Sequence, residues 1–315
     1  MKLKGLILAG GEGTRLRPFT LSAPKHLIPL LGKAMIEYPI QHLVDSEVRD
    51  IGVVVGYLGH LIEEYLGDNI LAHGIERYVK NFLEEQPDVY VMLCRVQDPS
   101  RFGVAVLKDK RIVKLVEKPK KFVSDMAMIG VYFFRDPDLV KKAFSTLRPS
   151  WRGEYEITEL IQWFIDHGYR VEYDVVSGWW KDVGTPEGLL DALYLLLDDI
   201  PTRIEGEIRG EVVGRVIIEK GAIVEGSIYG PAYVGDDVVV KSNAVIEHYV
   251  SVEARSKILS GVLTRSLVLN DSLIDINKLR LVDTVIGRYC SVTCKRELHG
   301  SIKLAISDYS KVNLL

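Results

Sequence analysis

The hydrophobic positions of this chain follow two different patterns, and one replaces the other near residue 200. In the first part, short apolar runs alternate with stretches that carry apolar residues at helical spacing. This order of strand, helix and strand is typical of an α/β domain with a mostly parallel sheet. The predicted strands lie at residues 4–9, 51–55, 89–94 and 128–134, and the predicted helices at residues 34–44, 75–85, 156–167 and 186–198.

Capping residues support the ends of two of these helices. Gly168 follows the third predicted helix in the position that favours a left-handed backbone. Thr185 as N-cap with Pro186 at the first helical position opens the fourth helix, and Pro201 follows its end. We therefore assign residues 1–200 to a first domain.

Beyond residue 200, apolar residues recur at every sixth position. The clearest run is Val234, Val240, Ile246, Val252 and Ile258. After a slip the period resumes at Val262, Val268, Ile274, Ile286 and Val292, with Arg280 as the polar exception. A three-sided coil that turns by a third of a revolution every six residues stacks such positions into one core. Residues 206–315 are therefore predicted to form a parallel β-helix; the alternative, a β-sandwich, would show a period of two.

Composition and charge narrow the classes of partner. Forty basic and 43 acidic side chains give a net charge of −3. The densest basic stretch, residues 108–121, is interleaved with apolar residues and predicts two strands with solvated edges. Because no basic patch stands out, we expect no nucleic-acid or membrane partner. We expect a cytoplasmic location, because the N-terminal apolar run at residues 6–9 is too short for a signal segment. The three cysteines indicate neither a disulfide framework nor a zinc site.

A glycine-rich segment follows the first predicted strand. It reads Gly10-Gly11-Glu12-Gly13-Thr14-Arg15, with Pro24-Lys25 downstream. Glycines allow backbone N–H groups to approach a phosphate chain, and Arg15 and Lys25 supply cations for a polyphosphate. The spacing fits neither the Walker loop nor the dinucleotide fingerprint. A plain turn at the end of a buried strand is the alternative.

This segment, together with four others, resembles the motifs of sugar-1-phosphate nucleotidylyltransferases. The other four occur in the family's order at residues 102–104, 116–119, 152–158 and 180–185. The resemblance covers most of residues 1–200. It is closest to the long, archaeal-type glucose-1-phosphate thymidylyltransferases, which combine a Rossmann-like nucleotidyltransferase domain with a C-terminal left-handed β-helix.

The resemblance implies transfer of a nucleoside monophosphate from dTTP or UTP to a sugar 1-phosphate, with glucose 1-phosphate as the expected acceptor and Mg²⁺ as the cofactor. It implies catalytic roles for Arg15 and Lys25. It implies nucleotide binding by Gly10, Gly11, Gly13 and Thr14. It implies sugar-phosphate binding by Glu117, Lys118, Arg152 and Glu156, and metal binding by Asp68 and Asp182. We expect Arg15, Lys25, Lys118 and Asp182 to converge on one cleft, and the repeat coils to support a homo-oligomer.

One part of the family's pattern is missing from this chain. The family places a strand-helix-strand unit, which carries a base-reading loop, before a Gly-Asp-Asn string. Here the string at residues 65–69 matches both the end of the helix before that unit and the residues after it. A sheet that lacks these strands is expected to expose apolar strand faces.

Two alternatives to this reaction remain open at the level of the sequence. A non-catalytic regulatory or structural homologue would keep the fold and have lost base recognition. The β-helix also resembles hexapeptide acyltransferases, with His248 beside Glu247 as a candidate base for acetyl transfer.

Overall fold

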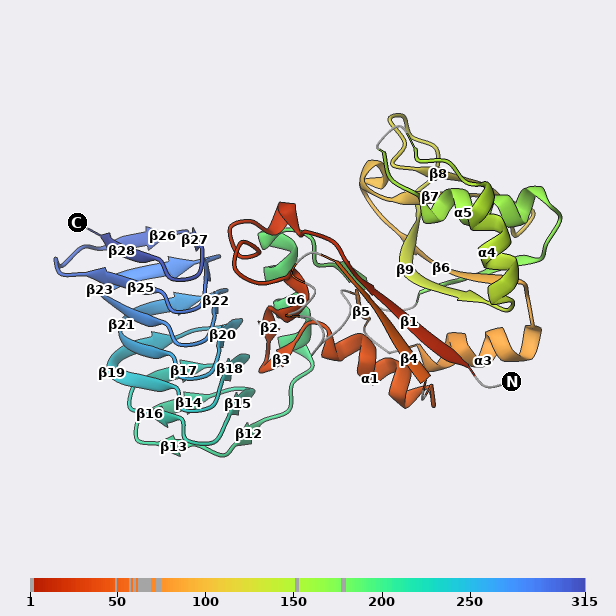
Figure 1. Cartoon of the computed structure of the whole chain (residues 1–315). Helices are drawn as coiled ribbons and strands as arrows, with labels where there is room; N and C mark the ends of the chain where they lie inside the picture. The colour runs from red at the N-terminus through yellow and green to blue at the C-terminus, as the bar shows by residue number, and fades with distance from the viewer. Residues whose placement is uncertain are drawn as a thin grey trace. The chain divides into compact units, whose positions relative to one another are not determined.

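The computed structural model describes residues 3–48, 50–56, 58, 61, 69–71, 75–150, 153–176 and 180–314. The chain forms two compact units, unit 1 (Met1–Ile70 with Lys181–Leu315) and unit 2 (Leu71–Trp180) (Figure 1). It passes between them at β5 (Asn69–Leu71) and β11 (Trp180–Asp182), two strands that pair with each other. None of the helices in the described ranges has the length and apolarity that a bilayer crossing requires.

Unit 2 is built on a five-stranded mixed sheet with strand order β10-β6-β9-β7-β8. β10 is parallel to β6, whereas β9 is antiparallel to β6, and β7 is antiparallel to both β8 and β9. Its elements are α3 (Glu76–Glu85), β6 (Val89–Arg95), η3 (Pro99–Arg101), β7 (Gly103–Lys108), β8 (Arg111–Glu117), β9 (Met126–Phe134), α4 (Pro137–Thr146), α5 (Ile157–Asp166) and β10 (Val171–Val175).

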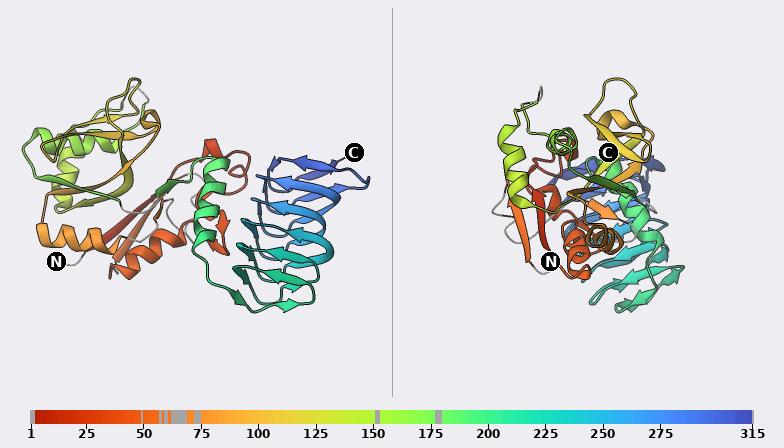
Figure 2. Two further views of the ribbon diagram at one scale, coloured as in Figure 1. Left: turned by 180° about the vertical axis from the view of Figure 1, so that it is seen from behind. Right: turned by 90° about the vertical axis from the view of Figure 1, so that its right-hand side faces the viewer.

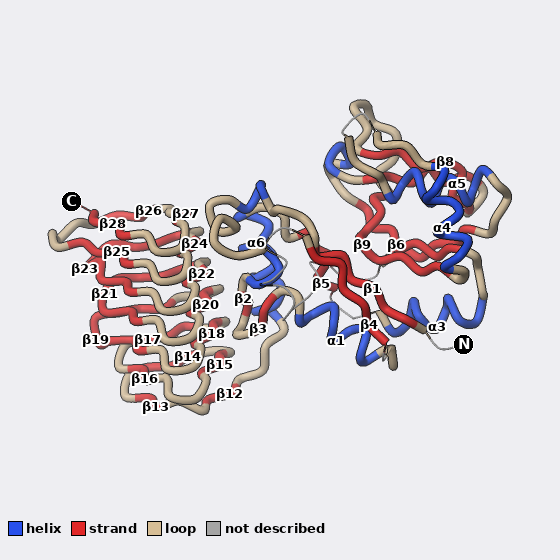
Figure 3. Tube along the Cα trace, viewed as in Figure 1, coloured by secondary structure: helices blue, strands red, loops and turns tan. Residues whose placement is uncertain are grey.

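Helices pack on both faces of this sheet because its strands alternate apolar side chains between the two faces. Val91 of β6 shares a core with Phe164 of α5, and α4 and α5 lie together over this face (Figure 3). On the other face, Phe82 of α3 stacks on Phe133 of β9, with ring centroids 5.4 Å apart. Tyr90 of β6 joins this second cluster.

In unit 1, β1 (Lys4–Ala9) pairs in parallel with β4 (Asp50–Val55), as the α/β order predicts. One face of β1 is buried, and Ile7 there is 8% exposed, whereas Leu6 and Leu8 on the other face are 66% and 62% exposed. Within the described residues, β4 is the only strand that pairs with β1. The expectation of an exposed apolar strand face is therefore confirmed.

The remaining elements of unit 1 before the β-helix are short. Residues predicted to open a helix at 34 instead complete the hairpin of β2 (Pro29–Leu30) and β3 (Lys33–Ala34), so α1 begins at Glu37. The predicted capping by Thr185 is confirmed, because its Oγ1 accepts a hydrogen bond of 3.0 Å from Gly188 N. The helical elements of this part of unit 1 are η1 (Thr14–Leu16), η2 (Lys25–Leu27), α1 (Glu37–Asp45) and α6 (Pro186–Asp198).

Three stacks of parallel strands form the β-helix (Figure 2). The first stack contains β12 (Arg203–Ile204), β15 (Val216–Ile218), β18 (Ala232–Val234), β20 (Val250–Val252), β22 (Leu267–Val268), β24 (Val285–Ile286) and β27 (Ala305–Ile306). The second contains β13 (Glu207–Ile208), β16 (Ile223–Val224), β25 (Ser291–Cys294), β28 (Lys311–Leu314) and the first halves of β19 (Val239–Ile246), β21 (Lys257–Thr264) and β23 (Leu273–Val282). The third contains β14 (Glu211–Val213), β17 (Ser227–Tyr229), β26 (Gly300–Ile302) and the second halves of the same three long strands.

The predicted core of the β-helix is confirmed at its clearest positions. The five residues of the first run, Val234, Val240, Ile246, Val252 and Ile258, are all fully buried.

The later period is wrong at two positions on the third face. Leu263, not Val262, is buried, and it pairs with Leu281 of the next coil. Val262 pairs with Arg280, so Arg280 occupies an outward position, where its guanidinium donates to Glu247. The register shifts within β21 explain this one-residue offset, and Arg280 is not a polar residue in the core.

The cysteines behave as small side chains rather than as cross-links. All three are free thiols, and Cys290 and Cys294 are buried in the core of the β-helix. Cys94, at the end of β6, is only partly buried.

The β2–β3 hairpin packs on the β-helix through a buried carboxyl group. Glu253 is 1% exposed. Its Oε2 accepts a hydrogen bond of 3.0 Å from Gly32 N, and its Oε1 accepts one of 2.7 Å from Ser251 Oγ. Burial raises the pKa of Glu253 from an ordinary 4.5 to about 7, although these hydrogen bonds act in the opposite direction. Gly32 is required here, because its φ is +76° and a Cβ would lie 2.3 Å from the hydroxyl of Tyr233.

The exposed face of β1 leads to a first prediction. Leu6→Thr should change the free energy of unfolding by less than about 0.5 kcal/mol, because the side chain is already in water. Ile7→Thr, one residue along on the buried face, should lower it by about 2 kcal/mol or more. Urea denaturation of both variants measures the two values, and equal losses would show that Leu6 is packed.

The buried Glu253 leads to a second prediction. Between pH 4.5 and 7 the folded state keeps the Glu253 proton that the unfolded state loses. Stability therefore falls as the pH rises through this interval, by on the order of 1 kcal/mol per pH unit. Glu253→Gln should remove this dependence, whereas the exposed Glu211→Gln should retain it. Denaturation curves across the interval make the comparison, and parallel profiles for wild type and Glu253→Gln would contradict it.

Candidate functional site

The glycine-rich loop that follows β1 lies directly against the segment that carries Lys25. Gly13 has a φ of +61°, and a Cβ at this position would lie 3.0 Å from Thr20 Cγ2 and 3.4 Å from Lys25 Cβ. Thr20 Oγ1 also donates a hydrogen bond of 2.8 Å to the carbonyl of Gly13. The structure therefore brings Gly13 and Lys25 together, although residues 14–24 separate them in the sequence.

The other predicted residues of this loop present their surfaces to solvent. Gly10 and Gly11 are exposed, and a Cβ at Gly11 would meet no atom within 4 Å. Thr14 and Arg15 lie exposed on η1, which is anchored by the fully buried Leu16. Backbone and side-chain groups of this loop are thus accessible to an anionic ligand.

A further glycine, which the sequence analysis did not single out, shapes the start of the loop. Gly56 directly follows β4, and a Cβ there would lie 2.6 Å from the carbonyl oxygen of Gly10. The two parallel strands can therefore end side by side only with a glycine at this position. A glycine immediately after the predicted strand at 51–55 was the available signal.

Lys25 begins η2 (Lys25–Leu27) and is partly buried. Pro24 precedes it in an extended conformation and stands at the N-cap position of this short helix. A second cation of the same region, Arg17, points to another group, because it forms an ion pair of 3.3 Å with Glu12.

In unit 2, Glu117 and Lys118 lie at the end of β8, next to the first turn of α5. Glu117 Oε2 accepts a hydrogen bond of 3.2 Å from Thr158 Oγ1. Gly103 makes room for this contact, since a Cβ there would lie 2.9 Å from Glu117 Oε2. Lys118 Nζ lies 3.6 Å from Glu117 Oε1, and Lys118 N donates to the carbonyl of Phe102 at 3.0 Å. Two of the predicted motifs, at 102–104 and 116–119, are therefore adjacent in space.

Glu156 stands at the N-cap position of α5 and is buried. Its Oε1 accepts a hydrogen bond of 2.8 Å from Ser150 Oγ, and its side chain makes no capping bond to the helix. Electrostatic support of a helix N-terminus is thus not the whole role of this carboxylate. Arg152, predicted beside it, lies outside the described residues.

The predicted metal ligands are only partly covered by the structure. Asp182 is the last residue of β11, and Asp68 lies outside the described residues. In the described part of the chain, no three His, Cys, Asp or Glu side chains gather as a metal site. A Mg²⁺ ion held by one or two carboxylates together with substrate phosphates needs no such cluster. Asp182 fits this kind of site by its donor type.

The candidate base for acetyl transfer has other neighbours. His248 is exposed, and its Nδ1 lies 2.6 Å from the carbonyl oxygen of Gly230. Glu247 accepts a hydrogen bond from Arg280. The two side chains therefore face different groups rather than each other.

The predicted cleft residues are divided between the two units. Arg15, Lys25 and Asp182 belong to unit 1, and Lys118 belongs to unit 2. Within unit 1, Gly13 joins Lys25, and within unit 2, Glu117 joins Lys118. The convergence of all four cleft residues stays a prediction.

Comparison with protein families supports the interpretation of the motifs. A family model described as nucleotidyl transferase matches residues 4–69 and 65–199. The two matched stretches share residues 65–69, so one short string aligns with two separate places of the family pattern. This is the result expected of a chain that lacks the segment between those places.

Relatives resemble the chain over its whole length. A glucose-1-phosphate thymidylyltransferase of Streptomyces griseus is 32% identical over 357 aligned residues, which cover 99% of both chains. The low-salt glycan biosynthesis nucleotidyltransferase Agl11 of Haloferax volcanii is 31% identical over 360 residues, which cover 99% of this chain and 100% of the relative. Both alignments are longer than the 315 residues of the chain, so they contain gaps opposite residues of the relatives.

A solved structure agrees with these matches. The protein is from Bacillus anthracis, is assigned as a glucose-1-phosphate thymidylyltransferase and was crystallised with sucrose. It is 31% identical, has a TM-score of 0.56, and matches 64% of this chain and 97% of its own. The chain therefore belongs to the nucleotidyl transferase family.

Proposed function

We propose that this protein transfers a nucleoside monophosphate from dTTP, or from UTP, to glucose 1-phosphate, forming a nucleotide-sugar and pyrophosphate. The observation that carries the proposal is the contact between Gly13 and Lys25 at the end of β1. This approach supports the proposal, because a loop with accessible backbone and a lysine in the neighbouring segment suit a triphosphate. The names of the full-length relatives support the choice of sugar and base.

The reaction needs alignment more than acid–base chemistry. An oxygen of the sugar phosphate attacks the α-phosphorus of the nucleoside triphosphate, and a new P–O bond forms. The bond between the α-phosphorus and the oxygen bridging to the β-phosphorus breaks, and pyrophosphate leaves with its electron pair. Because the attacking oxygen is already anionic, no general base is needed, and catalysis consists of positioning and charge neutralisation.

Unit 1 supplies the triphosphate side in this proposal. The loop residues Gly10, Gly11, Gly13 and Thr14 would bind the nucleotide. Arg15 and Lys25 would offset the negative charge on the α-phosphoryl group and the leaving pyrophosphate. Mg²⁺, held by Asp182 together with Asp68, would supply further neutralisation of phosphate charge when bound.

Unit 2 supplies the sugar side. Lys118 and Arg152 would bind the phosphate of the sugar, and Glu117 and Glu156 would accept hydrogen bonds from its hydroxyl groups. A carboxylate offers about four lone-pair sites. In this proposal the bond from Thr158 helps to fix the orientation of Glu117 toward the sugar.

A pyrophosphate-release assay with Mg²⁺ tests the proposal over a grid of nucleoside triphosphates and sugar 1-phosphates. We expect release with dTTP or UTP in the presence of glucose 1-phosphate. Within this assay, Lys25→Ala should lower kcat by about 10²- to 10³-fold, since it removes a cation from the site of charge development. Arg17→Ala, in the same segment but paired with Glu12, is the matched control and should retain activity.

Two outcomes would contradict this prediction. If the wild-type chain released no pyrophosphate with any pair of substrates, the result would favour a non-catalytic homologue. Equal losses in the Lys25 and Arg17 variants would show that the segment, rather than the Lys25 charge, matters.

A separate prediction concerns the sugar side. Glu117→Gln should raise KM for the sugar 1-phosphate by about tenfold, because one charged acceptor becomes neutral. KM for the nucleoside triphosphate should stay unchanged. Glu159→Gln, an exposed position in the first turn of α5, serves as the control. A change in KM for the nucleoside triphosphate instead would contradict the prediction, because it would show that Glu117 contributes to triphosphate binding.

A further inference from the structure

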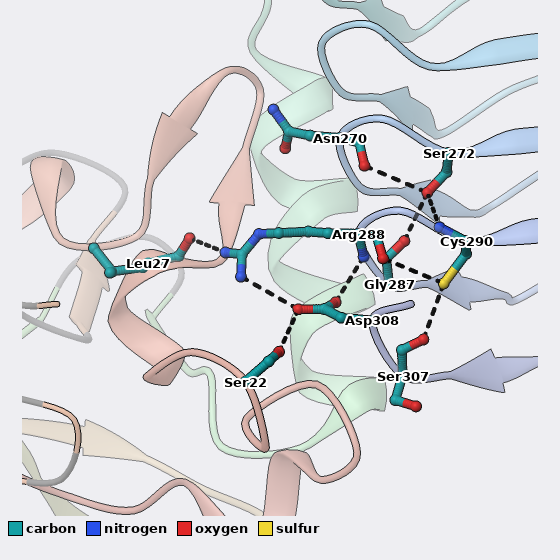
Figure 4. Close-up of polar contacts among 9 residues, drawn as sticks. All are labelled: Ser22, Leu27, Asn270, Ser272, Gly287, Arg288, Cys290, Ser307 and Asp308. Carbon is teal, nitrogen blue, oxygen red and sulfur yellow. Dashed lines mark hydrogen bonds and ion pairs between the residues drawn. The ribbon is translucent and has the colours of Figure 1, made fainter. Parts of the chain in front are cut away.

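Two neighbouring residues of the β-helix, Arg288 and Asp308, bond the segment before β2 at Leu27 and Ser22 (Figure 4). Arg288 Nη2 donates a hydrogen bond of 2.5 Å to the carbonyl of Leu27. Ser22 Oγ donates one of 2.5 Å to Asp308 Oδ2. Both contacts lie within unit 1, and Lys25 lies between their attachment points in the sequence. The β-helix therefore holds this short stretch of backbone at two places.

Arg288 and Asp308 are themselves fixed by one another. Asp308 Oδ1 accepts a hydrogen bond of 2.6 Å from Arg288 N, and Asp308 Oδ2 lies 3.5 Å from Arg288 Nη1. Their side chains are only 18% and 4% exposed. Gly287 permits this close approach of two coils, since a Cβ there would lie 2.7 Å from Asp308 Oδ1. A buried, multiply bonded pair of this kind has little freedom to move.

A second arginine–aspartate pair of the β-helix makes a different set of contacts. Arg255 Nε and Nη2 donate hydrogen bonds of 2.7 and 2.8 Å to the two carboxylate oxygens of Asp271. Both bonds connect adjacent coils within the β-helix. The contrast shows that Arg288 and Asp308 do more than join coils, because each also bonds a residue of the segment before β2.

We propose that Arg288 and Asp308 are positioning residues that fix the backbone on both sides of Lys25 and thereby hold its ammonium group in place for nucleotidyl transfer. This inference rests on the proposed function, in which Lys25 offsets charge on the triphosphate. Catalysis by charge neutralisation depends on a cation already in position when the charge develops. Loss of the two contacts lets residues 22–27 sample other conformations, and the rate falls without removal of any group that touches substrate.

The first experiment measures the backbone and does not depend on activity. Hydrogen exchange is recorded for wild type, Arg288→Ala and Arg255→Ala. We expect the amides of Leu27 and Ile28, which close the turns of η2, to exchange about tenfold faster in the Arg288 variant only. Equal protection in all three proteins would overturn the proposed grip on the segment.

The second experiment measures kinetics with the pyrophosphate-release assay. Arg288→Ala should lower kcat by about 10- to 100-fold while changing KM for the sugar 1-phosphate little. Arg288→Lys, which keeps a donor for Leu27, should recover part of the loss. Ser22→Ala removes only the contact with Asp308, so we expect a smaller loss in kcat. Because Ser22 is exposed and lies outside the β-helix, this variant should fold normally. Arg255→Ala should behave as wild type.

A double variant separates positioning from general structural support. If Arg288 acts through Lys25, then Arg288→Ala should cause no further loss of kcat in a Lys25→Ala background. Additive losses, or equal losses in the Arg288 and Arg255 variants, would overturn the positioning role.

Different results would overturn the proposed function and the positioning role. A wild-type chain with no transfer activity would overturn the proposed function and, with it, the role of Arg288 in the reaction. An active wild type with a fully active Arg288→Ala variant would overturn the positioning role alone.

Discussion

The close approach of the glycine-rich loop to Lys25 is the constraint on which the rest of the triphosphate side depends. A side chain at Gly13 would require a left-handed backbone that most residues avoid, and its Cβ would lie tightly, at 3.0 Å, against Thr20 Cγ2. A glycine at this position lets the loop follow this path past Thr20 and Lys25 without a strained backbone. Charge neutralisation in the proposed reaction therefore begins with a steric condition, and the lysine contributes only where that condition is met.

Much of the fold could be predicted from local pattern. The strand at 4–9, the capped helix after Thr185 and the buried positions of the β-helix follow from apolar spacing and capping residues. The helix α4 was missed although its signals are present: Asp136 accepts hydrogen bonds from the first-turn amides and Pro137 follows it. The offset at Leu263 could not be read from the period, because a shift of register within a strand moves the buried set by one residue and leaves both Val262 and Leu263 apolar.

The candidate site also has a part that the sequence predicts and a part that only the structure reveals. The sequence motifs identify four residues one by one: Gly13, Lys25, Glu117 and Lys118. The structure adds that Gly13 lies near Lys25 and that Glu117 lies near Lys118. Contacts between distant parts of the chain could not be predicted. Glu253 bonds a residue 221 positions away, and Arg288 bonds one 261 positions away. Both are charged residues in a repeat where charged residues are common on the surface, so nothing in the repeat marks Glu253 as buried or Arg288 as largely covered.

Because β1 pairs with only one strand in the described part of the chain, the contacts from the β-helix matter more for the position of the loop that follows it. In a sheet with strands on both sides, the strand that precedes a phosphate loop is fixed by two ladders and two buried faces. Here β1 pairs with β4 in the described part of the chain, and Leu6 and Leu8 are exposed. Support for the segment after the loop then comes from elsewhere in unit 1. The apolar side chains of Phe19 and Ile28 in this segment are buried. Glu253 accepts a hydrogen bond from Gly32, Arg288 donates one to Leu27, and Asp308 accepts one from Ser22. Contacts from the β-helix therefore add to the support that the β1–β4 ladder gives this region, so a change in the later coils is expected to alter the position of Lys25.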